Sequence, residues 1–336
     1  MSNFYDNWLT YWQAAKEERK AARVHIDEED LAWVRTSQDW RAALLCAREN
    51  GFFTSGAAMI SELPPRWHTG KHSHGEEVIY ILQGQGFSLV DGLRYDWEKG
   101  SGLFMPFGSI HQHFNTGTEV VRYFSAMALP LERFLGLAKL TQYEETGEIS
   151  MSAFNELDSL ERAPSPIHPE YGRIVLRLQD AIVATSKDAG AVKGKRTDEF
   201  TRTMPKEMRT SGVVGHHARN IYYMLAPENE FKTKEVMISS VLCDEPGKNS
   251  GRHSHMEALL YVLQGEGYSV IDGEKIPWKE GSLFHVQGPE TVHQHFNTGK
   301  CESQLMRIHY GIRSVFFQPI AGRVFPYNYY EFSAYK

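Results

Sequence analysis

The chain has 336 residues, of which 41% are hydrophobic and 12% aromatic, so it can bury two substantial cores in domains of about 150 residues each. A formal net charge of −6 argues against nucleic acid or an anionic membrane as the main partner and favours a small molecule. Three cysteines without CxxC spacing, an N-terminus unlike a secretory signal and no apolar run of about 20 residues predict a cytoplasmic location without a membrane segment.

Residues 1–50 are predicted to form an N-terminal helical arm. Trp8, Leu9 and Trp12 recur at helical spacing, and an acidic run at 27–30 supplies helix-start chemistry before a second apolar series that extends to residue 48. We expect the stripe of Trp and Leu to pack in a core or between subunits. The expected assembly is a homo-oligomer.

Two strand-rich segments, 51–130 and 216–336, are each predicted to contain a small barrel. Short β-type runs such as 78–82 and 259–263 alternate with Gly, Pro and Asp-Gly turns at a spacing of roughly 8–12 residues. This spacing is typical of an all-β sandwich or barrel.

Residues 131–215 interrupt the strand pattern and are predicted to be a connector. Residues 131–135 look helical, whereas 186–215 is polar and basic and is expected to be a solvated loop, with steering of an anionic substrate as the alternative. The aromatic tail, 325–332, is expected to pack on a domain or on a neighbouring subunit.

One stretch of the sequence occurs twice. Residues 72–92 and 253–273 align without a gap and are identical at 12 of 21 positions. Each copy is followed by the same heptad, His-Gln-His-Phe-Asn-Thr-Gly, at 111–117 and at 293–299. The chain is therefore a tandem duplication of a histidine cluster held between strands.

The duplicated histidines have the spacing of metal ligands. Two histidines at i and i+2 on a strand point to the same face, and a third from a facing strand can complete a three-nitrogen cap on a divalent ion. The predicted ligands are His72, His74 and His111 in the first site and His253, His255 and His293 in the second.

These motifs resemble those of the cupin superfamily, and specifically of two-domain bicupins. The second cupin motif is matched at every spacing by Gly100, Pro106, Gly108, His111 and Asn115. In the second copy Gly281, His293 and Asn297 match, but Gln287 replaces the proline and one residue is inserted. The resemblance implies an all-β fold of tandem cupin barrels (jelly rolls), here with the helical arm and a partly helical connector.

The glutamate of the first cupin motif is where the sequence departs from the family. Counted back from the motif's last glycine, its position falls on Glu77 in the first copy and on Ala258 in the second. Glu76 and Glu257 coincide between the repeats instead, so the fourth ligand is open among the three glutamates. The resemblance implies three histidines with Glu77 in the first site, and three histidines alone in the second, as in ring-cleaving cupin dioxygenases of the gentisate type.

Four further residues are candidates for catalysis. His113 and His295 share a strand face with the third ligand and could carry protons near the metal, or could form only structural hydrogen bonds. Arg122 and Arg307 lie on the last strand of each barrel, where they could grip a substrate carboxylate or form ordinary ion pairs.

The resemblance leaves several functions open, because one barrel fold hosts many chemistries. We expect an Fe(II) dioxygenase that cleaves a hydroxylated aromatic acid with O2. A Mn(II) enzyme resembling bicupin oxalate decarboxylases is the alternative, followed by a non-catalytic bicupin that binds ligands or stores nitrogen. The expected partners are thus an anionic small-molecule substrate and O2, not nucleic acid or a membrane.

Overall fold

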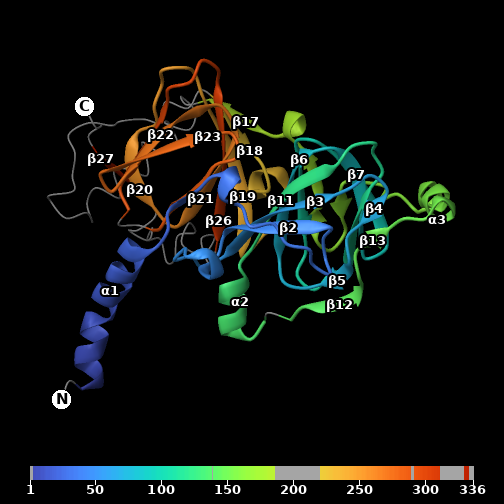
Figure 1. The fold of residues 1–336 in the computed structure, drawn as a ribbon, viewed down its shortest axis with the longest axis horizontal. Helices are drawn as coiled ribbons and strands as arrows, with labels where there is room; N and C mark the ends of the chain where they lie inside the picture. Colours follow the sequence, from blue (N-terminus) through green and yellow to red (C-terminus); the bar gives the residue numbers. More distant parts are fainter. Residues whose placement is uncertain (1–2, 138, 186–219, 289–290, 311–328, 333–336) are drawn as a thin grey trace.

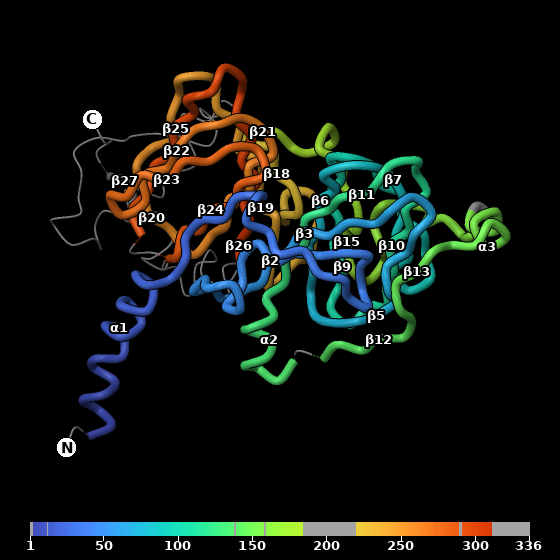
Figure 2. The backbone as a smooth tube through the Cα atoms, in the orientation of Figure 1, coloured from blue at the N-terminus to red at the C-terminus, as the bar shows by residue number. Residues whose placement is uncertain are grey.

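The computed structural model describes residues 3–137, 139–185, 220–288, 291–310 and 329–332. Two barrel-like β-sandwiches lie side by side, and helix α1 (Phe4–Ala21) extends away from them (Figure 1). The path of the chain through the two sandwiches can be followed in Figure 2. The predicted all-β class with two tandem barrels is confirmed.

The first barrel consists of two antiparallel sheets. One sheet has the strand order β16-β9-β6-β11-β3-β2; in the other, β12-β5-β10-β4-β13, strand β10 also pairs with β7, which pairs with β8. The strands of the first sheet are β2 (Arg41–Cys46), β3 (Ala57–Leu63), β6 (Glu77–Gln83), β9 (Ser101–Met105), β11 (Val121–Met127) and β16 (Val175–Arg177). Those of the second are β4 (Trp67–His68), β5 (Lys71–Ser73), β7 (Gln85–Val90), β8 (Leu93–Glu98), β10 (His111–Asn115), β12 (Thr141–Glu144) and β13 (Gly147–Glu148).

The second barrel repeats this arrangement with the sheets β1-β24-β21-β26-β19-β18-β17 and β23-β22-β25-β20-β27. The strands of its first sheet are β1 (His25–Ile26), β17 (Val183–Thr185), β18 (Asn220–Tyr223), β19 (Val236–Asp244), β21 (Ala258–Gln264), β24 (Leu283–Val286) and β26 (Ser303–Tyr310). Those of its second sheet are β20 (Arg252–His255), β22 (Glu266–Ile271), β23 (Glu274–Lys279), β25 (His293–Asn297) and β27 (Tyr329–Phe332).

Asp-Gly turns fix the same hairpin in both barrels. Asp91 and Gly92 both have positive φ (48° and 85°) and form a two-residue loop between β7 and β8, in which Val90 pairs with Leu93. Asp272 has the same left-handed conformation, with φ 49°. Aspartate and glycine tolerate this conformation, which matches the twist of the two flanking strands.

The prediction of helix in residues 1–50 holds only for its first half. α1 begins at Phe4, and the side chain of the N-cap residue Asn3 accepts hydrogen bonds from the backbone N–H groups of Tyr5 and Asp6. Trp8 on this helix is 67% exposed, so the stripe is not part of a core in the single chain, and packing between subunits remains a prediction. The prediction of helix over 27–48 is wrong, because β2 pairs with β3 and the sheet overrides the local periodicity.

The N-terminal segment after α1 contacts both barrels. β1 pairs with β24 of the second barrel, and β2 adds an edge to the first barrel's sheet. η1 (Glu28–Asp30) lies between them, and η2 (Arg48–Asn50) follows β2. The segment therefore connects the two barrels by pairing with a strand of each.

The connector is also shared between the barrels. α2 (Leu129–Leu135) confirms the predicted helical start, and β12, β13 and β16 join the first barrel whereas β17 joins the second. The other connector elements are α3 (Met151–Glu156), η3 (Leu157–Ser159), the hairpin β14 (Ile167–His168) with β15 (Gly172–Arg173), and η4 (Leu178–Asp180). A further short helix, η6 (Pro227–Asn229), precedes β19.

Some predictions lie partly or wholly outside the described residues. The basic segment at 186–215 lies entirely outside them, and so does the first half of the aromatic tail, 325–328. The last part of the tail forms β27, which pairs with β20, the strand that carries His253 and His255. The domain boundaries at 50, 130 and 215 remain predictions, although β2 already belongs to the first barrel's sheet. No helix in the described parts of the chain is long and apolar enough to cross a membrane.

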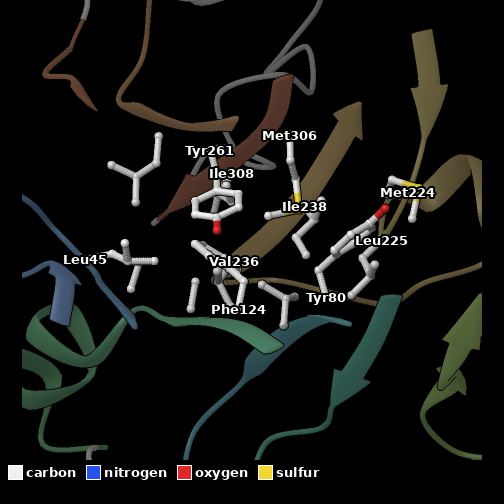
Figure 3. Close-up of a cluster of buried hydrophobic side chains, with 14 of the residues drawn as sticks. Leu45, Tyr80, Phe124, Met224, Leu225, Val236, Ile238, Tyr261, Met306 and Ile308 are labelled. Atoms are coloured by element: carbon white, nitrogen blue, oxygen red, sulfur yellow. The ribbon is translucent and has the colours of Figure 1, made fainter. Parts of the chain in front are cut away.

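The largest hydrophobic core lies between the barrels rather than inside either one (Figure 3). Both faces of strand β6 are buried. Ile79 and Ile81 pack inside the first barrel, whereas Val78 and Tyr80 pack toward the second. Phe124 and Tyr261, one from each barrel, meet there with ring centroids 5.5 Å apart. Burial of both faces explains the continuous apolar runs in these strands.

Two glutamates reach across this interface in equivalent ways. Glu76 accepts hydrogen bonds from the backbone N–H groups of Lys234 and Glu235, at 2.7 and 2.8 Å, just before β19. Glu257 accepts one from the N–H of Ser55, at 3.1 Å, just before β3. Each repeat therefore binds the segment that leads into the other barrel's sheet.

We expect Phe124→Ala to lower the free energy of unfolding by about 3–5 kcal/mol, because its fully buried ring would leave a cavity between the barrels. Phe134→Ala on α2 is the matched control, since that ring is 87% exposed and its loss should cost less than about 0.5 kcal/mol. Urea denaturation of both variants measures the difference. Equal, small effects would contradict the interface core.

A buried carboxyl group beside the first barrel's interior generates a second prediction. Asp39 is 3% exposed and accepts hydrogen bonds from Tyr123 and, at 3.2 Å, from Ser61. Burial, helped by the charge of Glu77, raises the pKa of Asp39 to about 7 even though both hydrogen bonds oppose the shift.

Asp39 should therefore make stability depend on pH. Because its folded pKa lies above the ordinary value of 3.8, the stability present at low pH is lost as the pH rises from about 4 to about 7. Over that range the wild type should lose on the order of 4 kcal/mol relative to Asp39→Asn. Denaturant titrations of both proteins at several pH values test this, and a constant difference would contradict it.

Candidate metal centres

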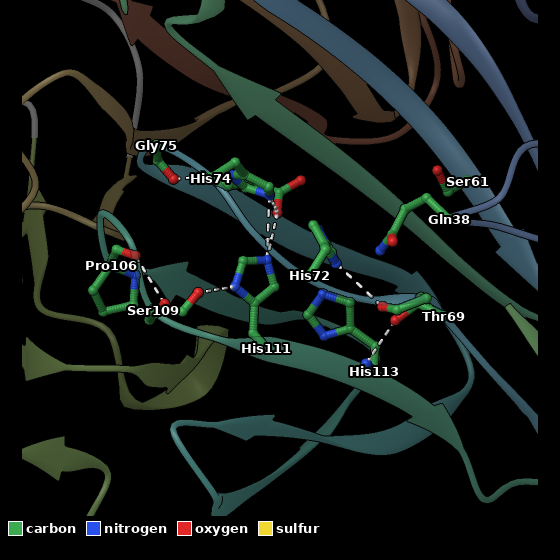
Figure 4. Close-up of polar contacts among 12 residues, drawn as sticks. Gln38, Ser61, Thr69, His72, His74, Gly75, Pro106, Ser109, His111 and His113 are labelled. Carbon is green, nitrogen blue, oxygen red and sulfur yellow. Dashed lines mark hydrogen bonds and ion pairs between the residues drawn. The ribbon is translucent and has the colours of Figure 1, made fainter. Parts of the chain in front are cut away.

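Pairing of β5 with β10 assembles the first histidine cluster. His111 lies directly opposite His72 in this pairing, His74 follows β5, and Glu77 begins β6 (Figure 4). The ring centroids of the three histidines lie 4.3–4.8 Å apart, and all four side chains are buried. One potential ligand atom from each residue lies within 4.8 Å of all the others. The predicted first set, including Glu77, is therefore brought together.

The backbone fixes the tautomer of each of these histidines. Nδ1 of His72, His74 and His111 lies 3.1, 2.9 and 3.0 Å from the carbonyl oxygens of Gly70, Gly75 and Ser109, respectively. A carbonyl oxygen can only accept, so Nδ1 must donate, and in the neutral ring Nε2 is left with a lone pair. This is the arrangement of metal-ligating histidines, whose outer nitrogen is held by a hydrogen bond.

The inward nitrogens fit a bound cation. Nε2 of His74 and Nε2 of His111 are 3.2 Å apart, and Oε2 of Glu77 lies 3.5 and 3.9 Å from them. Two lone pairs that face each other repel unless a proton or a metal ion lies between them. Imidazole nitrogens with one carboxylate suit a divalent first-row transition metal.

Burial and the charge of Glu77 shift the pKa values of the histidines in the first cluster in opposite directions. Burial lowers the pKa of His72 to about 4 and holds the pKa of His111 well below its ordinary value, so both rings stay neutral. Burial also opposes a charge on His74, but the hydrogen bond and charge of Glu77 outweigh it and raise the pKa of His74. The cluster is thus ready to exchange one proton for a metal ion.

The second cluster repeats the first without the carboxylate. His253 pairs with His293, and the ring centroids of these two and His255 lie 4.3–5.2 Å apart. Each Nδ1 again contacts a backbone carbonyl oxygen, at 2.6–3.0 Å. Nε2 of His293 is buried without a hydrogen-bond partner in the described part of the chain, as expected of a ligand atom. Ala258 occupies the position of Glu77.

His113 and His295 lie beside the candidate ligands, with ring centroids 5.8 Å from that of His111 and 5.2 Å from that of His293, respectively, and each belongs to a separate hydrogen-bond chain. The Nε1–H of Trp97 donates to Oγ of Ser88 at 2.9 Å, and that Oγ lies 2.7 Å from Nδ1 of His113. Since Ser88 accepts from Trp97, we assign its own hydrogen to His113 Nδ1, which leaves the His113 proton on Nε2. Trp278, Ser269 and His295 form the same chain in the second barrel, at 3.0 and 2.8 Å. A role for either histidine in catalysis remains a prediction.

Arg122 does not face the first cluster. It forms ion pairs with Glu28 at 2.6 Å and Glu62 at 2.9 Å, while its neighbour Tyr123 points into the barrel. Alternation along β11 therefore turns Arg122 outward, and its predicted role as a carboxylate clamp has no support in this geometry.

Arg307 faces the opposite way. It pairs across strands with Leu260, a residue of the second barrel's interior core, and its Nε donates to Oγ of Ser239 at 3.1 Å. The pairing of Phe124 with Tyr80 and of Met306 with Tyr261 makes Ser125, not Arg122, the equivalent of Arg307. The two arginines are thus not equivalent, because they lie on opposite faces of equivalent strands.

Glu76 and Glu257, the other candidates for a fourth ligand, accept hydrogen bonds from the opposite barrel as described above.

Reasoning from the sequence missed His309, which is 1% exposed and has its ring 6.1 Å from that of His255. Its position two residues after Arg307 was the available signal, since alternate residues share a strand face. No sequence signal marked Asp39, because only the tertiary fold brings it close to Tyr123.

The comparisons with known proteins agree with this architecture. The model of the cupin domain matches residues 59–127 and 240–308. A search of curated protein sequences found no match. Salicylate 1,2-dioxygenase from Pseudoaminobacter salicylatoxidans, in a structure with gentisate, is similar with a TM-score of 0.55 and 15% identity over 90% of this chain and 79% of the other. A single-residue variant of oxalate decarboxylase from Bacillus subtilis is similar with a TM-score of 0.58 and 14% identity over 89% of this chain and 82% of the other.

At these identities the two solved structures show a shared fold and no more. The two domain matches fall on the two barrels, and each contains one complete histidine cluster. The chain therefore contains two cupin domains, one in each barrel, and has the architecture of a bicupin.

Proposed function

We propose that this bicupin is a metal-dependent enzyme for a small anionic substrate, and specifically an Fe(II) dioxygenase that cleaves a hydroxylated aromatic acid with O2. The observation that carries the proposal is the second cluster, in which three buried imidazoles converge without a carboxylate. Neutral ligands leave the charge of a divalent ion uncompensated, which favours an anionic substrate. Salicylate 1,2-dioxygenase, similar in fold, supports this choice.

His72, His74, His111 and Glu77 would hold a metal in the first barrel, and His253, His255 and His293 would hold one in the second. Bound iron would supply the one-electron chemistry that lets a closed-shell ring react with O2. The chain itself contributes a buried site that excludes water and rings held in one tautomer. His113 and His295 could then supply a proton from Nε2, oriented through Ser88 and Ser269.

A manganese enzyme of the oxalate decarboxylase type is the second candidate. The first cluster favours it, because Glu77 adds a hard oxygen ligand that suits Mn(II). Oxalate decarboxylase from Bacillus subtilis is also similar in fold. A cytoplasmic location and a homo-oligomer remain part of the proposal, the latter motivated by the exposed stripe on α1.

Activity should distinguish the two candidates. Protein purified without oxygen is reconstituted with Fe(II) or Mn(II), and O2 uptake and CO2 release are measured with catechols, gentisate-like acids and oxalate. We expect O2 uptake that depends on Fe(II) and on an aromatic acid, with a ring-opened product. CO2 release from oxalate with Mn(II) would select the alternative, and no turnover with any substrate would favour a non-catalytic bicupin.

Metal content should reach about two ions per chain after reconstitution, because both clusters are complete. His253→Ala should reduce it to about one. His168→Ala, which replaces a histidine outside both clusters, is the control and should keep both ions. Elemental analysis provides the measurement, and a value near one that His253→Ala leaves unchanged would mean that the second cluster does not bind metal.

His111→Ala and His113→Ala should have opposite effects on the first centre. His111 contributes an inward Nε2, so its loss should empty that centre, whereas His113 is bonded to Ser88 and its loss should keep the metal and lower the rate. Metal content of each variant, measured in a His255→Ala background, isolates the first centre. Metal loss in the His113 variant alone would reverse the assignment.

A further inference from the structure

The two histidine clusters are surrounded by different side chains at three equivalent positions. Ala258 replaces Glu77 at the start of β21, as the alignment of the repeats shows. Arg307 replaces Ser125 on the last strand, as the equivalent pairings of Phe124 and Met306 show. These two replacements remove a negative charge and add a positive one, so both change the local charge in the same direction.

The third replacement lies beside the first. In the first barrel Met127 pairs across strands with Glu77. Its equivalent in the second barrel is His309, which is buried and has its ring 6.1 Å from that of His255. Nδ1 of His309 lies 3.2 Å from the carbonyl oxygen of Glu257, so this nitrogen donates. An imidazole therefore stands beside the position where the first barrel has a carboxylate.

Arg307 is placed to act inside the second barrel. Its strand position faces the interior core through Leu260, on the same strand face as His309, whose ring lies 6.1 Å from that of His255. The guanidinium is bonded to Ser239 through Nε, which orients it. Guanidinium groups bind carboxylates through paired hydrogen bonds, so an anion beside His293 would have a charged partner besides the metal.

We propose that the second barrel holds the anion-binding centre of the protein and that Arg307 binds the carboxylate of an aromatic hydroxy acid there, with His309 as a neighbouring polar group. The first centre, whose metal charge Glu77 partly neutralises, binds such an anion more weakly. This inference deepens the proposed function and rests on it for the identity of the substrate. It does not depend on turnover, because it concerns binding.

Binding to single-centre proteins tests the proposal. His74→Ala leaves the second centre intact and His255→Ala leaves the first, and each protein is loaded with Co(II), whose visible spectrum reports ligand binding. Salicylate is the probe, and salicylamide, which has a neutral amide in place of the carboxylate, is the control ligand. We expect salicylate to bind the second centre at least about tenfold more tightly than the first.

Variants of the second-centre protein then test Arg307. Arg307→Met should weaken salicylate binding roughly ten- to a hundredfold, the range for loss of one charged hydrogen bond, and should leave salicylamide binding nearly unchanged. Arg307→Lys should recover part of the affinity, because it keeps the charge without the paired donors. Equal loss for both ligands would show a structural role instead and overturn the proposal.

A gain of binding provides evidence that misfolding cannot imitate. In the first-centre protein, Glu77→Ala should tighten salicylate binding, since it removes the carboxylate that competes with the anion. Equal affinity of the two centres, no effect of Arg307→Met, or no cobalt spectrum in the His74→Ala protein would each overturn the inference. Ring cleavage with unchanged salicylate affinity in Arg307→Met would overturn this inference but not the proposed function. The expected binding difference without any turnover would instead support the inference and count against the proposed reaction.

Discussion

Burial of both faces of one sheet in each barrel is the constraint on which the rest of the structure depends. In β6, Val78 packs against the other barrel and Ile79 packs inside its own, so a shift of one residue would exchange the two faces. The register of β6 and of β21 is therefore fixed from two sides. Since Glu77 begins β6 and His74 lies three residues earlier, the same constraint positions the first cluster.

The interface and the metal centres are linked through adjacent residues. Glu76 binds the backbone of the second barrel, and Glu77, its neighbour in sequence, faces the first cluster. In the second barrel Glu257 binds Ser55 and also His285, at 2.9 Å. A carboxylate that accepts several hydrogen bonds restricts the motion of its own segment. Contact between the barrels therefore also orders the turn next to Glu76 or Glu257, which carries His74 or His255.

The sequence predicted those parts of the site that depend on local spacing. His72 and His74 share a face by alternation, and the repeat made His253 and His255 equivalent to them, so both candidate ligand sets could be proposed before the fold was known. The prediction failed where pairing between distant segments decides the outcome. The segment that forms β2 has a helical apolar pattern but pairs with β3 in a sheet. Arg122 faces outward, which could not be predicted because sequence spacing does not give the strand register. Asp39 and His309 became candidates only once the fold placed them beside Tyr123 and His255.

We propose that the two inward-facing imidazole clusters, one in each barrel, hold two metal ions in chemically different centres. Anomalous X-ray diffraction from crystals of the reconstituted protein, recorded on both sides of the metal absorption edge, tests it most directly. We predict two peaks, one among His72, His74, His111 and Glu77 and the other among His253, His255 and His293. A peak at neither cluster, or the metal bound elsewhere, would contradict the account.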